Sequence, residues 1–215
     1  MSPLVVTIII VAVLAVLFHI GALWARGHVY ASLESLVSAG ELDEFFRKVD
    51  ARSTRALLAP YGRELLRFRA LAKAGDRSAM AQQLERLLKL KLTAYERSCV
   101  LTEAFNAFSA AGDAARCRQL VDEMARAGFA DKALAAYRSH LEMALEHKSG
   151  ASRQLEEAYP SLKGKRRAYA AYLLAKAADT AHDAKAAASY RASAASLYGC
   201  SESELDGRAH VVTTV

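Results

Sequence analysis

The densest group of side chains able to bind an anion is a basic run at residues 163–167, which reads KGKRR. Ammonium and guanidinium groups recognise phosphate and carboxylate oxygens, so the run predicts contact with a phospholipid headgroup, an acidic peptide or a nucleic acid. An ordinary basic linker has the same composition, and the sequence leaves both interpretations open. The candidate contact residues are Lys163, Lys165, Arg166 and Arg167.

Side chains that could support catalysis or bind a metal ion are scattered. His140 and His147 are seven residues apart, which places them on nearly one helix face but about 10 Å from each other. A shared metal ion would need further ligands at that separation, so we expect both histidines on the surface or in a groove. The sequence lacks a glycine-rich phosphate loop and the Gly-x-Ser-x-Gly, His-Glu-x-x-His and Cys-x-x-Cys motifs. We therefore predict a protein that is not an enzyme and has no metal ion or cofactor.

The three cysteines are Cys99, Cys117 and Cys200. Cys99 and Cys117 fall on opposite arms of one predicted helical hairpin, at levels that differ by about 12 Å. A disulfide needs Cα atoms within about 7 Å of each other. We expect thiols packed in the core, which agrees with a reducing compartment.

The elements that must position these residues are helices joined by regularly spaced turns. Glycine and proline are scarce, at 11 and 3 residues, and alanine is abundant, which favours helices. Turn signals centred on Gly40, Gly75, Gly112, Gly150 and Asp183 recur at intervals of about 32 to 38 residues, with apolar residues at helical spacing on both sides. A left-handed glycine ends the first helix of such a pair, and an aspartate caps the second. The pattern predicts an all-α fold of about five antiparallel helical hairpins.

This period, with a Gly-Asp turn in mid-repeat, resembles the tetratricopeptide repeat family. Ala-Gly-Asp at 74–76 and 111–113 carries the resemblance, and Ala158-Tyr159-Pro160 is similar to the family's repeat-closing proline. The resemblance covers residues 29–198, within a predicted repeat domain of residues 26–198, and implies a solenoid of stacked hairpins whose concave face binds a protein or peptide partner. Candidate groove residues are Tyr137, Arg138, Tyr169 and Tyr172.

One segment, 111–129 (AGDAARCRQLVDEMARAGF), also looks like a pentatricopeptide unit. That family reads single-stranded RNA at one base per repeat. Readout needs many such units in series and only one is present, so we do not expect a nucleic-acid partner.

The stretch from residue 4 to residue 25 contains no Asp, Glu, Lys or Arg. Its 22 residues would form a helix of about 33 Å, enough to cross a hydrocarbon core of about 30 Å. A cleaved signal peptide is the alternative, but it requires a basic start, a shorter apolar segment and a small-x-small cleavage site. We predict a retained transmembrane helix that continues into the first hairpin, loosened at Gly27.

Basic residues occur only on the carboxyl side of this helix, beginning with Arg26 and continuing with Arg47, Lys48, Arg52 and Arg55. Because Lys and Arg are enriched on the cytoplasmic side of membrane helices, we expect a single-pass cell-membrane protein with its N-terminus outside and its helical domain in the cytoplasm.

Residues 199–215 lack helical periodicity, and we expect a flexible tail. It ends in Thr213-Thr214-Val215, which fits a pattern that PDZ-type domains recognise by strand addition and carboxylate capture. The whole chain sums to +6 and the tail to −2, so the helical body carries +8.

These patterns predict a membrane-anchored adaptor or assembly factor that binds a protein or peptide through a helical-repeat surface. Two alternatives remain open. One is binding of nucleic acid or anionic lipid through a basic face near the membrane, and the other is a non-catalytic subunit of a membrane enzyme complex. A homodimer of the solenoid would also fit.

Overall fold

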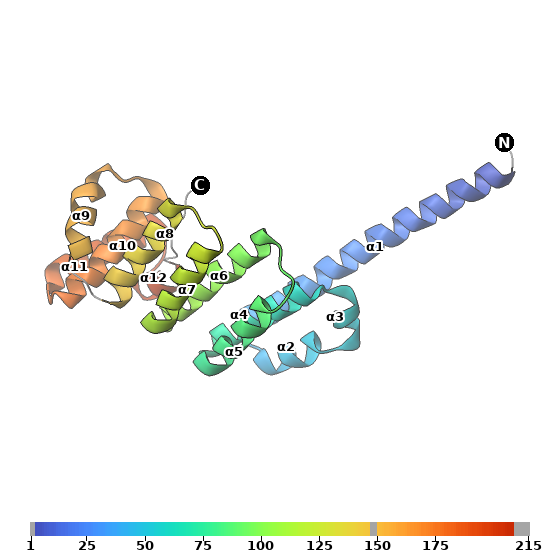
Figure 1. Cartoon of the computed structure of the whole chain (residues 1–215), viewed down its shortest axis with the longest axis horizontal. Helices are drawn as coiled ribbons and strands as arrows, with labels where there is room; N and C mark the ends of the chain where they lie inside the picture. Colours follow the sequence, from blue (N-terminus) through green and yellow to red (C-terminus); the bar gives the residue numbers. More distant parts are fainter. Residues whose placement is uncertain (1–2, 147–149, 209–215) are drawn as a thin grey trace. The chain divides into compact units, whose positions relative to one another are not determined.

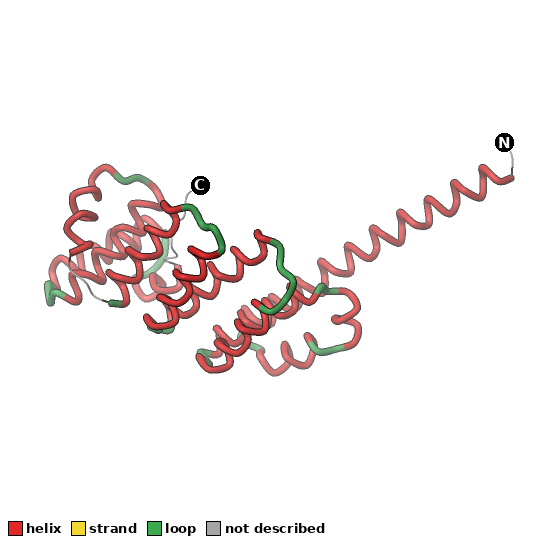
Figure 2. Tube along the Cα trace, viewed as in Figure 1, coloured by secondary structure: helices red, strands yellow, loops and turns green. Residues whose placement is uncertain are grey.

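The computed structural model describes residues 3–146 and 150–208, and every regular element in these ranges is helical (Figure 2). The prediction of an all-α protein is confirmed for this part of the chain. Two compact units make up the chain, Met1–Leu92 and Thr93–Val215. The boundary falls inside the single repeat domain predicted for residues 26–198.

One long helix, α1 (Pro3–Ala39), dominates unit 1 and runs through Gly27 without a break (Figure 1). Ten of the twelve large hydrophobic side chains that the described residues expose lie between Ile10 and Trp24. A helix in water does not expose such a continuous apolar surface without a partner. Within the described residues, α1 is the helix long and apolar enough to cross a membrane.

The carboxyl-terminal third of α1 belongs to the core of unit 1. Leu33 is 1% exposed and clusters with Phe45, Val49 and Leu66, which come from α2 (Leu42–Val49) and α4 (Pro60–Ala74). The unit is completed by α3 (Arg52–Leu57) and α5 (Arg77–Leu88). Because one unbroken helix supplies both the exposed apolar segment and a core face, no flexible linker separates the two.

Unit 2 packs around aromatic side chains from two of its helices, where Phe105 meets Tyr137 and His140. Its helical elements are α6 (Ala94–Ala110), α7 (Ala114–Arg126), α8 (Asp131–His140), the π-helical turn η1 (Leu141–Leu145), α9 (Gly150–Ala158), the 3₁₀ turn η2 (Tyr159–Ser161), α10 (Gly164–Thr180), α11 (Ala184–Tyr198), the 3₁₀ turn η3 (Glu202–Glu204) and α12 (Leu205–Arg208).

The predicted turn chemistry is present at the centre of three helical pairs, α4–α5, α6–α7 and α10–α11. Gly75 and Gly112 have φ values of 72° and 71°, in the left-handed region that glycine tolerates best. Asp76 and Asp113 each accept a hydrogen bond of 2.9 Å from the backbone three residues later, which caps the second helix. At the third turn His182 takes the left-handed position, with φ 58°.

The start of the predicted tail differs from expectation. Residues 202–208 form η3 and α12, and Leu205 is 3% exposed. Ser201 and Glu204 form a capping box that starts this segment. One buried leucine against α11 is too short a signal to produce helical periodicity, which is why the sequence did not indicate it. Thr213-Thr214-Val215 lies outside the described residues.

Candidate functional site

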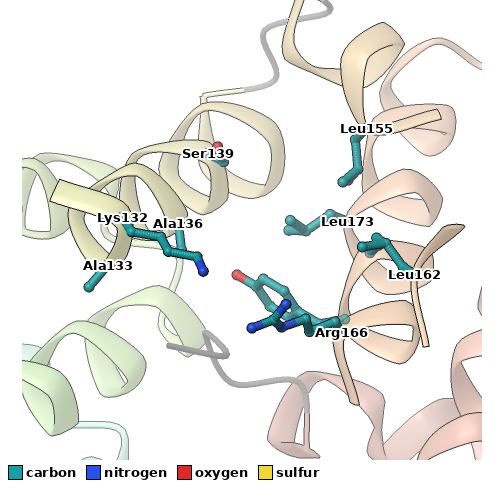
Figure 3. A pocket seen from close by; sticks show the side chains of 10 residues that line it. Lys132, Ala133, Ala136, Ser139, Leu155, Leu162, Arg166 and Leu173 are labelled. Atoms are coloured by element: carbon teal, nitrogen blue, oxygen red, sulfur yellow. The ribbon is translucent and has the colours of Figure 1, made fainter. Parts of the chain in front are cut away.

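A hollow of about 270 Å³ opens between α8 and α10 in unit 2 (Figure 3). We call it the α8–α10 pocket. Its walls come from α8, α9, α10 and the segment that leads into α10. The lining residues are Lys132, Ala133, Ala136, Ser139, Leu155, Leu162, Arg166, Tyr169, Ala170 and Leu173.

Small side chains create the space and larger apolar ones form its walls. Ala133 and Ala136 face it from α8, and Leu162 and Leu173 border it on the α10 side. Because alanine carries a single methyl group, these turns of α8 leave a gap that leucines would have filled. The result is a mainly apolar surface, on which a ligand would gain free energy by losing contact with water.

Two cations stand at the rim of the apolar walls. Lys132 lies in the first turn of α8 and Arg166 in the first turn of α10, and both are exposed. In Figure 3 their charged ends both point into the space between the two helices. Two positive charges beside an apolar hollow suit a ligand that carries a carboxylate or phosphate next to an apolar group.

A chain of buried hydrogen bonds begins at the pocket wall. The hydroxyl group of Tyr169 bonds to Nδ1 of His140, and Nε2 of His140 lies 2.5 Å from Oγ of Ser109. The His140 and Tyr169 rings are also stacked, with centroids 5.9 Å apart and an angle of 5° between their planes. This hydrogen-bond chain therefore links α10 to α8 and α6 through polar atoms in the core.

Burial decides the protonation state of Tyr169 in this hydrogen-bond chain. Burial raises the pKa of Tyr169 well above its ordinary value, and charge interactions with Tyr172, Tyr198 and Tyr137 raise it further. The phenol therefore stays protonated at neutral pH. A neutral imidazole donates from one nitrogen and accepts at the other, so the His140 tautomer sets the direction of the whole chain.

A second hollow of about 180 Å³ lies at the other end of this chain. Ser109, Tyr172, Lys176 and Asp206 are among the residues that line it. Asp206 accepts a 3.0 Å hydrogen bond from the Tyr172 hydroxyl and forms a 2.9 Å ion pair with Lys176. Burial alone would raise the pKa of Asp206, but the hydrogen bond and charge of Lys176, the Tyr172 hydrogen bond and the charge of Arg191 together hold that pKa below its ordinary value.

The predicted basic run does not act as one cluster in the described structure. Arg166 lines the α8–α10 pocket, and the guanidinium of Arg167 lies over the Tyr159 ring at 5.0 Å from its centroid. Lys163 occupies the cap position of α10, and Lys165 is exposed in its first turn. Of the four predicted residues, Arg166 alone is among those that line the two hollows described above.

The four predicted groove residues also lie in different parts of unit 2. Tyr169 lines the α8–α10 pocket and Tyr172 the second hollow. Tyr137 is 0% exposed, packs edge-on against Phe105 and donates a 3.2 Å hydrogen bond to Thr102. Arg138 is exposed and is not among the residues that line either hollow.

The expectation that His140 lies at the surface or in a groove is wrong. Its side chain is 3% exposed and is held between Ser109 and Tyr169. These partners are 31 and 29 residues away in sequence, so no local pattern could indicate them. Lys132 was missed for the same reason, because a lone lysine early in a helix has no motif. His147 lies outside the described residues.

Within residues 3–146 and 150–208, no three metal-ligating side chains come together, and the three cysteines are free thiols. Comparison with known proteins finds no matching family model, no similar curated protein and no similar solved structure. A functional conclusion therefore depends on the chemistry of the pocket, the hydrogen-bond chain and the apolar helix.

Proposed function

We propose that this is a single-pass membrane protein acting as an adaptor or assembly factor, and that its α8–α10 pocket binds a partner segment carrying a carboxylate beside an apolar side chain. The observation that carries the proposal is the pairing of Lys132 and Arg166 above walls of alanine and leucine. Neither cation is needed to fill the core, since both are exposed. Their positions suit recognition of an external anion.

The size of the pocket supports a peptide over a free small molecule. Pockets for drug-sized ligands measure about 300–1,000 Å³, and this one is slightly below that range at about 270 Å³. It has room for one or two side chains of a larger partner. Such anchors, buried in a pocket and surrounded by a polar rim, contribute most of the affinity at protein interfaces.

Membrane anchoring is supported by the apolar surface of α1. Phe18 is 81% exposed and Trp24 is 72% exposed, and a hydrocarbon environment would remove that surface from water. We propose the N-terminus outside and the helical domain, residues 26–198, in the cytoplasm, because the basic residues follow the apolar part of the helix. Anchoring would then raise the effective concentration of a bound partner at the membrane.

We further propose that the helical pairs stack as tetratricopeptide-like repeats. Three pairs share a central turn with a left-handed residue followed by an aspartate cap. A recurring turn of one chemistry supports repetition of one supersecondary unit. Measuring the shape of the full-length protein in nanodiscs by cryo-electron microscopy tests this, and a non-solenoidal arrangement would reject it.

A hydrolytic role for Ser109 and His140 fits less well. Their contact has the form of a nucleophile beside its base. The other nitrogen of His140, however, meets the Tyr169 hydroxyl where serine hydrolases place a carboxylate. A neutral phenol supplies no negative charge to stabilise an imidazolium. We therefore propose that the hydrogen-bond chain holds the pocket wall in position.

The binding proposal is tested by photo-crosslinking in intact cells, with a benzophenone amino acid replacing Ser139 at the pocket wall of the full-length protein. Reversing both charges, Lys132→Glu with Arg166→Glu, should lower capture of the specific partner at least about tenfold, because charge-assisted contacts become repulsions. The control reverses two exposed charges that do not line the pocket, Arg138→Glu with Lys185→Glu.

Mapping the crosslinked peptide decides the outcome. The proposal requires an Asp, Glu or C-terminal carboxylate beside an apolar residue in that peptide, and rescue of capture when the partner's carboxylate is replaced by lysine opposite the reversed pocket. Equal capture by the pocket variant and its control would refute it. Separately, an impermeant thiol reagent that labels a Ser203→Cys variant in intact cells would refute the cytoplasmic orientation.

A further inference from the structure

One end of unit 1 carries a hollow of its own, beside the helix proposed to cross the membrane. After the turn at Gly40, α2 runs back along α1, so that α3 and the start of α4 lie at the end of the unit from which the apolar part of α1 projects (Figure 1). The hollow measures about 320 Å³, and Arg26 of α1 lines it together with residues 56–59. We call it the α3 hollow.

The position of Arg26 along α1 sets the depth of this hollow. The 22 residues from 4 to 25 span about 33 Å, close to the hydrocarbon thickness of about 30 Å. The headgroup layer adds about 5–7 Å on each side, which corresponds to roughly three to five further residues of helix. Residues 26–30 therefore cross that layer, and the α3 hollow, which Arg26 borders, lies within it.

The next contacts along α1 agree with this placement. Trp24 stacks on His28, with ring centroids 5.4 Å apart, and such aromatic groups favour the membrane interface. Farther along, Arg69 of α4 donates to the Tyr30 hydroxyl at 3.1 Å and pairs with Glu34 at 3.3 Å. The first carboxylate along α1 thus falls beyond the headgroup layer, on the aqueous side.

The charge at this end of unit 1 is positive. Arg26 and Arg52 are exposed, and neither has an ion-pair partner within the described residues. Arg52 lies four residues before Ala56, so the two share a face of α3. Asp50, a carboxylate close to α3 in sequence, is already paired with Arg55 at 3.0 Å and with Arg67.

We infer that the α3 hollow binds the headgroup of an anionic phospholipid from the membrane in which α1 is embedded. Arg26 and Arg52 meet the phosphate and the second anionic group, and Ala56, Leu57 and Ala59 contact the glycerol and the upper acyl chain. The inference rests on the proposed membrane insertion of α1. It assigns α3 a role that the α8–α10 pocket does not share, which is to seat unit 1 against one leaflet.

Lipid is favoured over a protein partner because of depth and chemistry together. At the level of the headgroup layer, the groups that surround α1 are lipid phosphates, glycerol esters and the first acyl carbons. Their order, anionic outside and apolar inside, matches a hollow with a guanidinium next to alanine and leucine side chains. Each basic residue near an anionic leaflet contributes about fivefold in binding.

The test uses the full-length protein in vesicles of phosphatidylcholine, with or without phosphatidylserine. A benzophenone amino acid replaces Ala56, and lipid adducts are detected by mass spectrometry after illumination. Ser78, exposed in the first turn of α5, carries the probe in the reference protein. We expect a phosphatidylserine adduct at position 56, little at 78, and a fall of roughly tenfold or more when Arg26→Gln and Arg52→Gln are combined.

A matched pair, Lys73→Gln with Arg77→Gln, removes two exposed charges from the opposite end of unit 1 and should leave the adduct unchanged. The anionic site is refuted if the adduct yield stays the same when phosphatidylserine is omitted, or when both arginines are replaced. No lipid adduct at position 56, in protein that still floats with the vesicles after alkaline extraction, refutes the seating of α3 while retaining the anchor. Release of the protein by alkaline extraction refutes the anchor itself.

Discussion

Replacement of Tyr169 by phenylalanine isolates the hydrogen-bond chain behind the α8–α10 pocket. The change removes one oxygen and leaves the ring, which stacks on His140 at 5.9 Å. Nδ1 of His140 then loses its Tyr169 partner in a side chain that is 3% exposed. Leaving a buried polar group without its hydrogen bond costs about 1–3 kcal/mol, so we expect Tyr169→Phe to destabilise unit 2 by that amount.

A double-mutant cycle distinguishes the hydrogen bond from packing. His140→Phe removes the shared partner of both hydroxyl groups, Tyr169 and Ser109. In that background, Tyr169→Phe should cost about zero, because the phenol has no imidazole left to bond. The expected coupling energy is about 1–3 kcal/mol, within the range of about 0.5–3 kcal/mol seen for contacting residues.

Thermal unfolding of the full-length protein in detergent, followed by circular dichroism, measures these effects. For a chain of this size, 1 kcal/mol shifts Tm by roughly 2–4 °C, and hydrogen exchange in α8 and α10 locates the change in unit 2. Tyr95→Phe is the control, since Tyr95 is 78% exposed. A Tyr169→Phe effect below about 0.5 kcal/mol, or one of equal size with and without His140, would refute the reasoning.

Three further outcomes are expected from other parts of the chain. Leu33→Ala should destabilise unit 1 by about 2–5 kcal/mol, measured by hydrogen exchange in α2 and α4, whereas Leu23→Ala, at a side chain 51% exposed, should leave it unchanged. Asp206 has a folded pKa below its unfolded value, so its contribution is present above about pH 4 and lost as the pH falls through the folded pKa. Because this side chain is 66% exposed, Asp206→Asn should cost less than about 1 kcal/mol at neutral pH and nothing at strongly acid pH, seen as faster exchange in α12. Burial raises the pKa of Cys117 to about 12, so alkylation of the native protein, read by mass spectrometry, should modify the two half-buried cysteines well before Cys117.

Local chemistry accounts for the features that could be predicted. Gly75 and Asp76 form the expected helix end and helix cap, because both depend on residues within four positions. The apolar helix near the N-terminus could be predicted for a similar reason, since the ability of a helix to cross a membrane depends on its length and composition. In each case the residues that decide the outcome are neighbours in sequence.

The candidate site could not be predicted in the same way. Tyr169 was singled out as a groove residue and does line the α8–α10 pocket, but Tyr137, singled out on the same grounds, lies in the core. Both are tyrosines on helical faces, and exposure depends on which neighbouring helix packs on that face. The same ambiguity hid Lys132, whose significance comes only from Arg166 across the hollow.

Three features of this protein follow from its amino-acid sequence: its helical character, the positions of several turns and caps, and the long uncharged apolar helix near its N-terminus. These properties follow from backbone preference, short-range hydrogen bonding and composition, which act over a few residues. Three other relations depend on tertiary packing: Ser109, His140 and Tyr169 form one hydrogen-bond chain, α1 reaches from its apolar segment into the core of unit 1, and Arg26 borders the α3 hollow. These relations join residues between 12 and about 33 positions apart, and the helix packing that brings them together depends on the shape and burial of whole faces.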